Sequence, residues 1–68
     1  MVKVEKIKLD PRTMTAVADL VADSQSDVQP GMQVEGLPQG YTLGMGSSVF
    51  TMDQDIAFLD SNGTWIWG

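Results

Sequence analysis

The residues of this chain whose type and spacing could do chemistry are three aspartates near its C-terminal end. The segment Asp60-Ser61-Asn62-Gly63-Thr64 has some features of a calcium-binding loop, because side-chain oxygens precede a glycine. It lacks a third ligand before the glycine and the distal bidentate glutamate that such loops use. Asp53 and Asp55 are better explained as turn formers. We therefore expect no metal site and interpret all three aspartates as turn residues.

Catalysis is not indicated either. Paired carboxylates can do acid–base work, but here they fall in expected turns. The chain of 68 residues has no histidine and no cysteine, which removes the commonest general base, the commonest transition-metal ligand and the thiolate nucleophile. Gly40, Gly44 and Gly46 do not form a phosphate loop, because no lysine or helix start follows them. We expect no enzyme activity, no catalytic residue and no cofactor.

Charge is divided sharply along the chain. Seven acidic residues and no basic residue follow position 12, and the net charge of the whole chain is −5. An acidic body disfavours direct contact with nucleic acid, because phosphates repel it. The basic N-terminal end is either a docking surface for an acidic subunit or the solvated side of an edge strand, where lysines deter aggregation. Its four basic residues are Lys3, Lys6, Lys8 and Arg12.

Length and hydropathy limit the chain to a single small domain over residues 1–68. A domain of this size buries only about 60% of its unfolded surface, so a monomer would be marginally stable. No run of about 18 apolar residues is present, so we expect no membrane span. The N-terminal end has no apolar signal core, so we expect no secretion by a signal peptide.

Two elements are predicted in the N-terminal third. Residues 1–9 alternate as a strand, and the alternation changes parity at Glu5-Lys6, which indicates a bulge. Residues 10–24 are predicted to form a helix, because Asp10 suits the N-cap and Pro11 suits the first helical position. A stripe at helical spacing would then cover one sheet face: Met14, Val17, Ala18, Leu20 and Val21.

Residues 25–47 are predicted to form an extended arm. The segment holds five of the seven glycines, which excludes a helix, yet apolar side chains are spread through it. Tyr41, Leu43 and Met45 alternate and could add a strand to the sheet edge of a partner. The alternative is a loop that folds over its own domain.

Residues 48–68 are predicted to form a three-stranded antiparallel meander. Asp60 suits the first position of a type I turn and Gly63 suits the left-handed position after it, which would pair Leu59 with Trp65. A two-residue turn at Asn62-Gly63 is the alternative and would pair Asp60 with Trp65. The first hairpin is expected to turn at Asp53-Gln54 or Gln54-Asp55.

Both faces of this meander are apolar. In the favoured register one face carries Phe50, Met52, Ala57, Leu59, Trp65 and Trp67, and the other carries Val49, Thr51, Ile56, Phe58 and Ile66. Because one helix can cover only one face, the second face is expected to need another chain. The predicted partner interface consists of Val49, Thr51, Ile56, Phe58, Ile66, Trp67, Tyr41, Leu43 and Met45.

The C-terminal sequence also resembles a known motif. It contains the blocks Gly46-Ser47-Ser48-Val49-Phe50-Thr51-Met52-Asp53, Ile56-Ala57-Phe58-Leu59-Asp60 and Gly63-Thr64-Trp65. These blocks resemble a motif of small tailed-phage structural proteins, in which a Gly-Ser opens a strand, an Asp marks a turn, and a Trp follows a later turn. The resemblance implies a multi-copy virion component of the capsid-associated, decoration or head–tail joining type. Such a protein would be assembled in the host cytoplasm and would bind other protein subunits.

The sequence thus predicts an α+β fold with a strand, a helix, an arm and a meander. The function that it favours is that of a non-enzymatic structural protein in an assembly. The alternative is a small module that binds a peptide or a glycan through Tyr41, Trp65 and Trp67, since exposed aromatic side chains suit both ligands.

Overall fold

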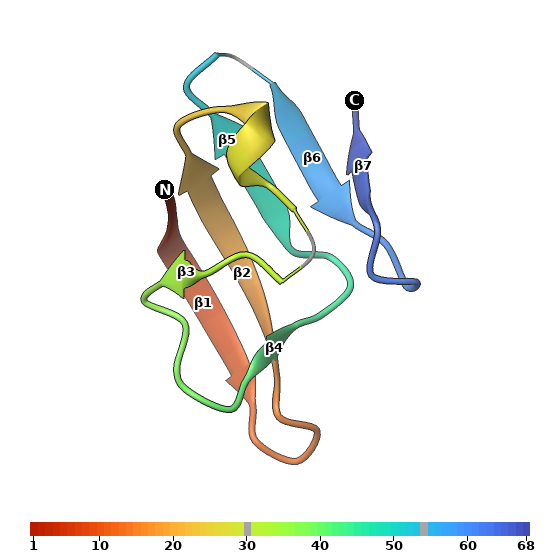
Figure 1. The fold of residues 1–68 in the computed structure, drawn as a ribbon. Coiled ribbons are helices and arrows are strands. Elements are labelled where there is room, and N and C mark those ends of the chain that lie inside the picture. The colour runs from red at the N-terminus through yellow and green to blue at the C-terminus, as the bar shows by residue number, and fades with distance from the viewer. Residues whose placement is uncertain (30, 54) are drawn as a thin grey trace.

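The structure is a computed structural model that describes residues 1–29, 31–53 and 55–68. These residues form one mixed β-sheet, and a central segment covers one of its faces (Figure 1). The strand order is β3-β1-β2-β5-β6-β7, with β4 pairing to β2 beside this path. The elements are β1 (Val2–Asp10), β2 (Thr15–Ala22), the 3-10 turn η1 (Gln25–Asp27), β3 (Val34–Glu35), β4 (Thr42–Leu43), β5 (Ser48–Thr51), β6 (Ile56–Leu59) and β7 (Trp65–Trp67).

The strand predicted at the N-terminal end is confirmed, and so is its bulge. β1 and β2 pair as an antiparallel hairpin from Val2 opposite Ala22 to Asp10 opposite Thr15. The register shifts between Val4 and Lys6, at the point where the alternation of apolar residues changes parity. Because the bulge adds one residue, the apolar residues before and after it share one face of the sheet.

The predicted helix over residues 10–24 is wrong, and with it the α+β class: the described chain is nearly all β. Asp10 and Pro11 open a turn between two strands, because the Asp10 carboxylate accepts a hydrogen bond from the Arg12 amide at 3.1 Å. Met14 then takes a positive φ of 54°, which ends any helical path. The residues taken for a helix therefore form the hairpin turn and strand β2.

Tertiary pairing explains why β2 is a strand. It is hydrogen-bonded to β1 along one edge and to β5 and β4 along the other, and the Ala18 amide between these two segments donates to the Ser47 hydroxyl at 3.2 Å. Its apolar residues fit an alternation of two as well as a helical period. In the strand, one face is buried and consists of Ala16, Ala18, Leu20 and Ala22.

The covering segment, residues 23–29 and 31–47, folds back over its own sheet (Figure 1). β3 adds to β1 in parallel, with Val34 opposite Val2, and β4 adds to β2 in parallel, with Leu43 opposite Ala16. A backbone hydrogen bond extends this pairing: the Gly44 amide donates to the Ala16 carbonyl at 2.8 Å. The prediction of an extended arm for a partner's sheet edge is therefore wrong, and the alternative loop is correct.

The core lies between the covering segment and the covered face of the sheet. Val28 enters it from the residues after η1, and Met32, Val34 and Leu43 pack against it. Its buried residues are Val2, Ala18, Leu20, Ala22, Val28, Val49 and Ala57.

The C-terminal meander is confirmed, and its second hairpin has the favoured register. Leu59 lies opposite Trp65, and Phe58 lies opposite Ile66. The Asp60 carboxylate accepts from the amides of Asn62 and Thr64, both at 2.9 Å, while Gly63 has a φ of 82°. This is the expected turn with a left-handed glycine.

The first hairpin has neither expected register: its pairing is shifted by one residue from that of a turn at Asp53-Gln54 and by three residues from that of a turn at Gln54-Asp55. Val49 lies opposite Ala57 and Phe50 opposite Ile56, so the Thr51 amide donates to the Asp55 carbonyl at 2.9 Å. Gln54, which both predicted turns contained, lies outside the described residues. Because a slip of one residue exchanges the faces of a strand, β5 is turned over relative to the prediction.

Candidate interaction surfaces

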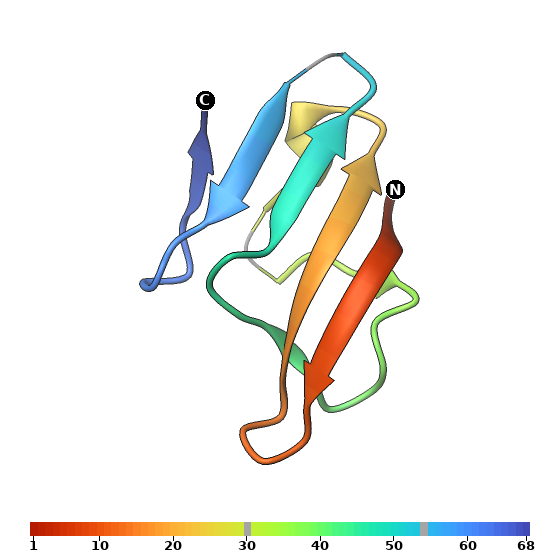
Figure 2. The same ribbon diagram turned by 180° about the vertical axis from the view of Figure 1, so that it is seen from behind.

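The open face is the uncovered side of the sheet, and Figure 2 shows it from the front. Neighbouring strands place apolar side chains beside one another there, as with Phe50 next to Ile56 and Phe58 next to Ile66. Phe50, Phe58 and Ile66 are each about half exposed, at 50%, 52% and 51%. We define the open face by its apolar residues Val17, Val21, Phe50, Ile56, Phe58 and Ile66.

Charged side chains lie along only one side of the open face, the side next to β1. The cross-strand partners of Asp19 and Val21 on β1 are Lys6 and Lys3, so lysines border one side. Asp19 in turn accepts a hydrogen bond from the Ser48 hydroxyl at 3.0 Å. Beyond Ser48, the strands β5, β6 and β7 present only apolar side chains to this face. The face is thus an apolar surface with one polar margin.

The size of this patch is large for so small a chain. An aromatic side chain presents roughly 200 Å², so the two half-exposed phenylalanines alone leave roughly this area in water. The aliphatic side chains bring the patch to several hundred Å², the range of the largest patches on typical monomers, which are often functional. It remains below the roughly 800 Å² that each partner buries in a standard stable interface.

The structure brings together some of the predicted interface residues and separates others. Ile56, Phe58 and Ile66 lie together on the open face. Val49 and Thr51 do not lie on the open face, because both are fully buried. In β5 it is Phe50 that lies on the open face, where Val49 and Thr51 were expected.

One signal in the sequence could have placed Phe50 correctly. The Thr51 hydroxyl accepts a hydrogen bond from the Asp55 amide at 3.1 Å and donates to the Asp53 carboxylate. A threonine followed by two aspartates can therefore close the hairpin with its side chain inside the turn. In that arrangement Thr51 belongs to the turn and Phe50 faces outward.

The remaining predicted interface residues lie away from the open face. Leu43 in β4 and Trp67 in β7 are half-buried and pack against the core. Tyr41 is half-buried in the covering segment, and Met45 is 66% exposed in the turn before β5. None of these four residues contributes to the apolar surface formed by Ile56, Phe58 and Ile66.

A cavity of about 270 Å³ lies between the covering segment and the sheet. It brings Tyr41 and Trp65 together, whereas Trp67 is not part of its lining. Its volume falls just below the usual range for small-molecule sites, and its walls are mainly apolar. Its main apolar lining residues are Met32, Val34, Leu37, Leu43, Leu59 and Trp65.

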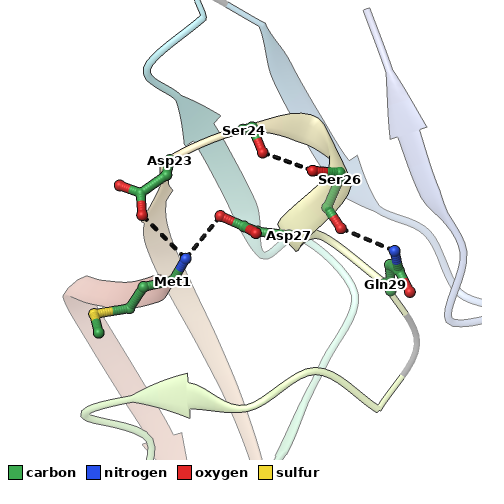
Figure 3. Close-up of polar contacts among 6 residues, drawn as sticks. All are labelled: Met1, Asp23, Ser24, Ser26, Asp27 and Gln29. Atoms are coloured by element: carbon green, nitrogen blue, oxygen red, sulfur yellow. Dashed lines mark hydrogen bonds and ion pairs between the residues drawn. The ribbon is translucent and has the colours of Figure 1, made fainter.

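Ion pairs hold the N-terminal end of β1 against the start of the covering segment (Figure 3). The Met1 ammonium lies 2.7 Å from Asp27 Oδ2 and 3.1 Å from Asp23 Oδ2. The hydrogen bonds to these carboxylates raise the pKa of the Met1 amine, and the bond from the amine lowers the pKa of Asp27. The close-up also shows Gln29 Nε2 donating to the Ser26 carbonyl at 2.9 Å.

The aspartates considered for metal binding have local partners. Asp60 caps its own turn, Asp53 accepts from Thr51, and Asp55 accepts from Gln25 Nε2. Within residues 1–29, 31–53 and 55–68, no group of three or more acidic, histidine or cysteine side chains is placed to hold a metal ion. The same residues include no helix long and apolar enough to cross a membrane.

No family model, curated protein or solved structure matches this chain. We base the proposed function on the open face and the cavity.

Proposed function

We propose that the protein is a non-enzymatic assembly subunit that binds other protein subunits through its open face. One observation carries the proposal: a contiguous apolar surface stays in water on a sheet whose other face is already covered by the chain itself. Covering such a surface is favourable at about 25 cal/mol per Å² of apolar area. The resemblance of the C-terminal meander to tailed-phage structural proteins favours a virion as the assembly.

The proposal is tested by placing a charge at the centre of the open face. Phe58→Asp should weaken association, because the carboxylate would have to be desolvated at a contact. Phe58 is 52% exposed and lies outside the core, so the subunit should stay folded. Sedimentation velocity should show a smaller species than for the unchanged chain, with the same far-UV circular dichroism.

Met45→Asp is the matched control. It makes a similar change of charge at an exposed apolar residue that lies in the covering segment rather than on the open face. This variant should sediment like the unchanged chain. If Phe58→Asp associates as strongly as Met45→Asp, the open face is not the binding surface.

A second candidate function is the binding of a peptide or a glycan in the cavity. The observation that favours it is that Tyr41 and Trp65 line one concave, mainly apolar space. A binding module should be a folded monomer in solution, and Tyr41→Ala should weaken its ligand binding while Phe58→Asp leaves it unchanged. Sedimentation of the unchanged chain separates the two functions, because an assembly subunit should associate.

A further inference from the structure

The two edges of the sheet are protected unequally. On the β1 side, β3 pairs with Val2 and Lys3, the bulge interrupts the strand after Val4, and lysines follow. These are devices by which proteins prevent strands from adding to an edge. On the other side the sheet ends at β7, whose residues Trp65–Trp67 include no charge, proline or bulge. Among the residues that the structure describes, the β7 edge is therefore the one open to another strand.

The hydrogen bonds of β7 determine which backbone groups point outward. The Asp60 amide donates to the Thr64 carbonyl, and the Gly68 amide donates to the Ile56 carbonyl, both at 3.0 Å. Backbone groups alternate along a strand, so Thr64, Ile66 and Gly68 direct theirs toward β6. The amides and carbonyls of Trp65 and Trp67 consequently point away from the sheet.

We propose that a second copy of this chain pairs antiparallel along β7, with Ile66 opposite Ile66 of the other copy. In this register Trp65 of each copy lies opposite Trp67 of the other. Each such pair exchanges two hydrogen bonds, so the outward amides and carbonyls of both strands are all satisfied. A shift by two residues would leave half of them unpaired, and a shift by one would direct them past each other.

This pairing also continues both faces of the sheet. A twofold axis perpendicular to the sheet leaves each face on its own side, so the two open faces meet at Ile66 and form one surface. Its area then approaches that of one side of a standard interface, which a single copy does not reach. On the covered side, Trp65 lies beside Trp67 of the other copy, and aromatic pairs across strands are stabilising.

A cysteine at position 66 tests the register directly, because the chain has no cysteine of its own. Ile66 and its counterpart form a pair without hydrogen bonds, whose Cα atoms lie about 4.5 Å apart, within the range of disulfides. Phe58→Cys is the matched control: Phe58 lies on the same face, one strand further in, and is 52% exposed against 51% for Ile66. In a glutathione buffer, Ile66→Cys should yield at least tenfold more disulfide-linked dimer than Phe58→Cys.

A charge exchange provides a second measurement that does not depend on oxidation. Ile66→Lys and Ile66→Glu should each reduce dimerisation at least tenfold, because like charges would lie directly opposite. An equimolar mixture should recover a dimer that contains one of each, detected by native mass spectrometry. The same exchange at Phe50, which lies two strands away from β7, should produce no such mixed dimer.

The possible results separate this proposal from that of the assembly function. Equal cross-linking at positions 66 and 58 would contradict the edge pairing and indicate face-to-face contact. A mixture of the two charged variants that stays monomeric would contradict it as well. Conversely, preferential cross-linking at position 66 that persists in Phe58→Asp would support the edge pairing even if the open face binds no partner.

Discussion

Replacing Val49 by alanine tests the register of β5, which decides the composition of both the core and the open face. Val49 is fully buried opposite Ala57, whereas its neighbour Phe50 is half exposed. Val49→Ala removes two carbon atoms, worth about 0.8 kcal/mol each in transfer from water, and it leaves a cavity with a further cost. We expect the free energy of unfolding to fall by about 2–3 kcal/mol.

Phe50→Ala is the comparison. Its side chain is larger, but half of it is in water already, so roughly half of the 1.5–3 kcal/mol for a fully buried residue is at stake. We therefore expect a loss of about 1 kcal/mol, smaller than that for Val49→Ala although more atoms are removed. A larger loss of unfolding free energy for Val49→Ala than for Phe50→Ala, although valine is the smaller side chain, is what this register predicts.

Urea denaturation followed by tryptophan fluorescence measures both variants, because Trp65 and Trp67 pack against the core. A domain of 68 residues has a total stability of roughly 3–10 kcal/mol, so the change for Val49→Ala should be a large fraction of it. With a denaturant slope of about 1 kcal/mol/M, the midpoint should shift by about 2 M at an unchanged slope. A larger loss for Phe50→Ala than for Val49→Ala would refute the register and restore Phe50 to the core.

Two further predictions concern a turn and the ion pairs. Gly63→Ala should destabilise the protein by about 1–2 kcal/mol, because φ is 82° there, while no atom lies within 4 Å of an added Cβ; thermal unfolding should show a smaller loss for Gly63→Asn, since asparagine tolerates this conformation. Asp27→Asn should destabilise the protein most between pH 4 and pH 8. The pKa of Asp27 is lowered from 3.8, so its stabilisation is lost as the pH falls through the folded value. The pKa of the Met1 amine is raised above its ordinary value of 8.0, so the same stabilisation is lost as the pH rises through the raised pKa of the folded protein. Urea denaturation at pH 3, 6 and 10 should show the largest difference at pH 6, and an equal difference at all three would contradict the pairing.

Local chemistry was sufficient where one short segment decides its own geometry. The turn after β6 depends on the carboxylate of Asp60 and the left-handed φ of Gly63, so the pairing of Leu59 with Trp65 follows from five adjacent residues. The bulge in β1 follows from a change of parity that any strand with one buried face must absorb. The apolar character of both faces of the meander was likewise evident from side-chain alternation alone.

Long-range pairing decided the rest. Residues 15–22 fit a helix and a strand almost equally well, and hydrogen bonds to β1 on one edge and to β5 and β4 on the other favour the strand. The covering segment has weak local preferences, and it is held by backbone contacts with strands about 30 residues away, such as Gly44 with Ala16. Which residues of β5 are buried depends on one extra position in a turn, since a strand exchanges its faces at every residue. These features are decided by which residues become buried when distant segments pair in the sheet. A local stretch of the sequence holds no information about that pairing.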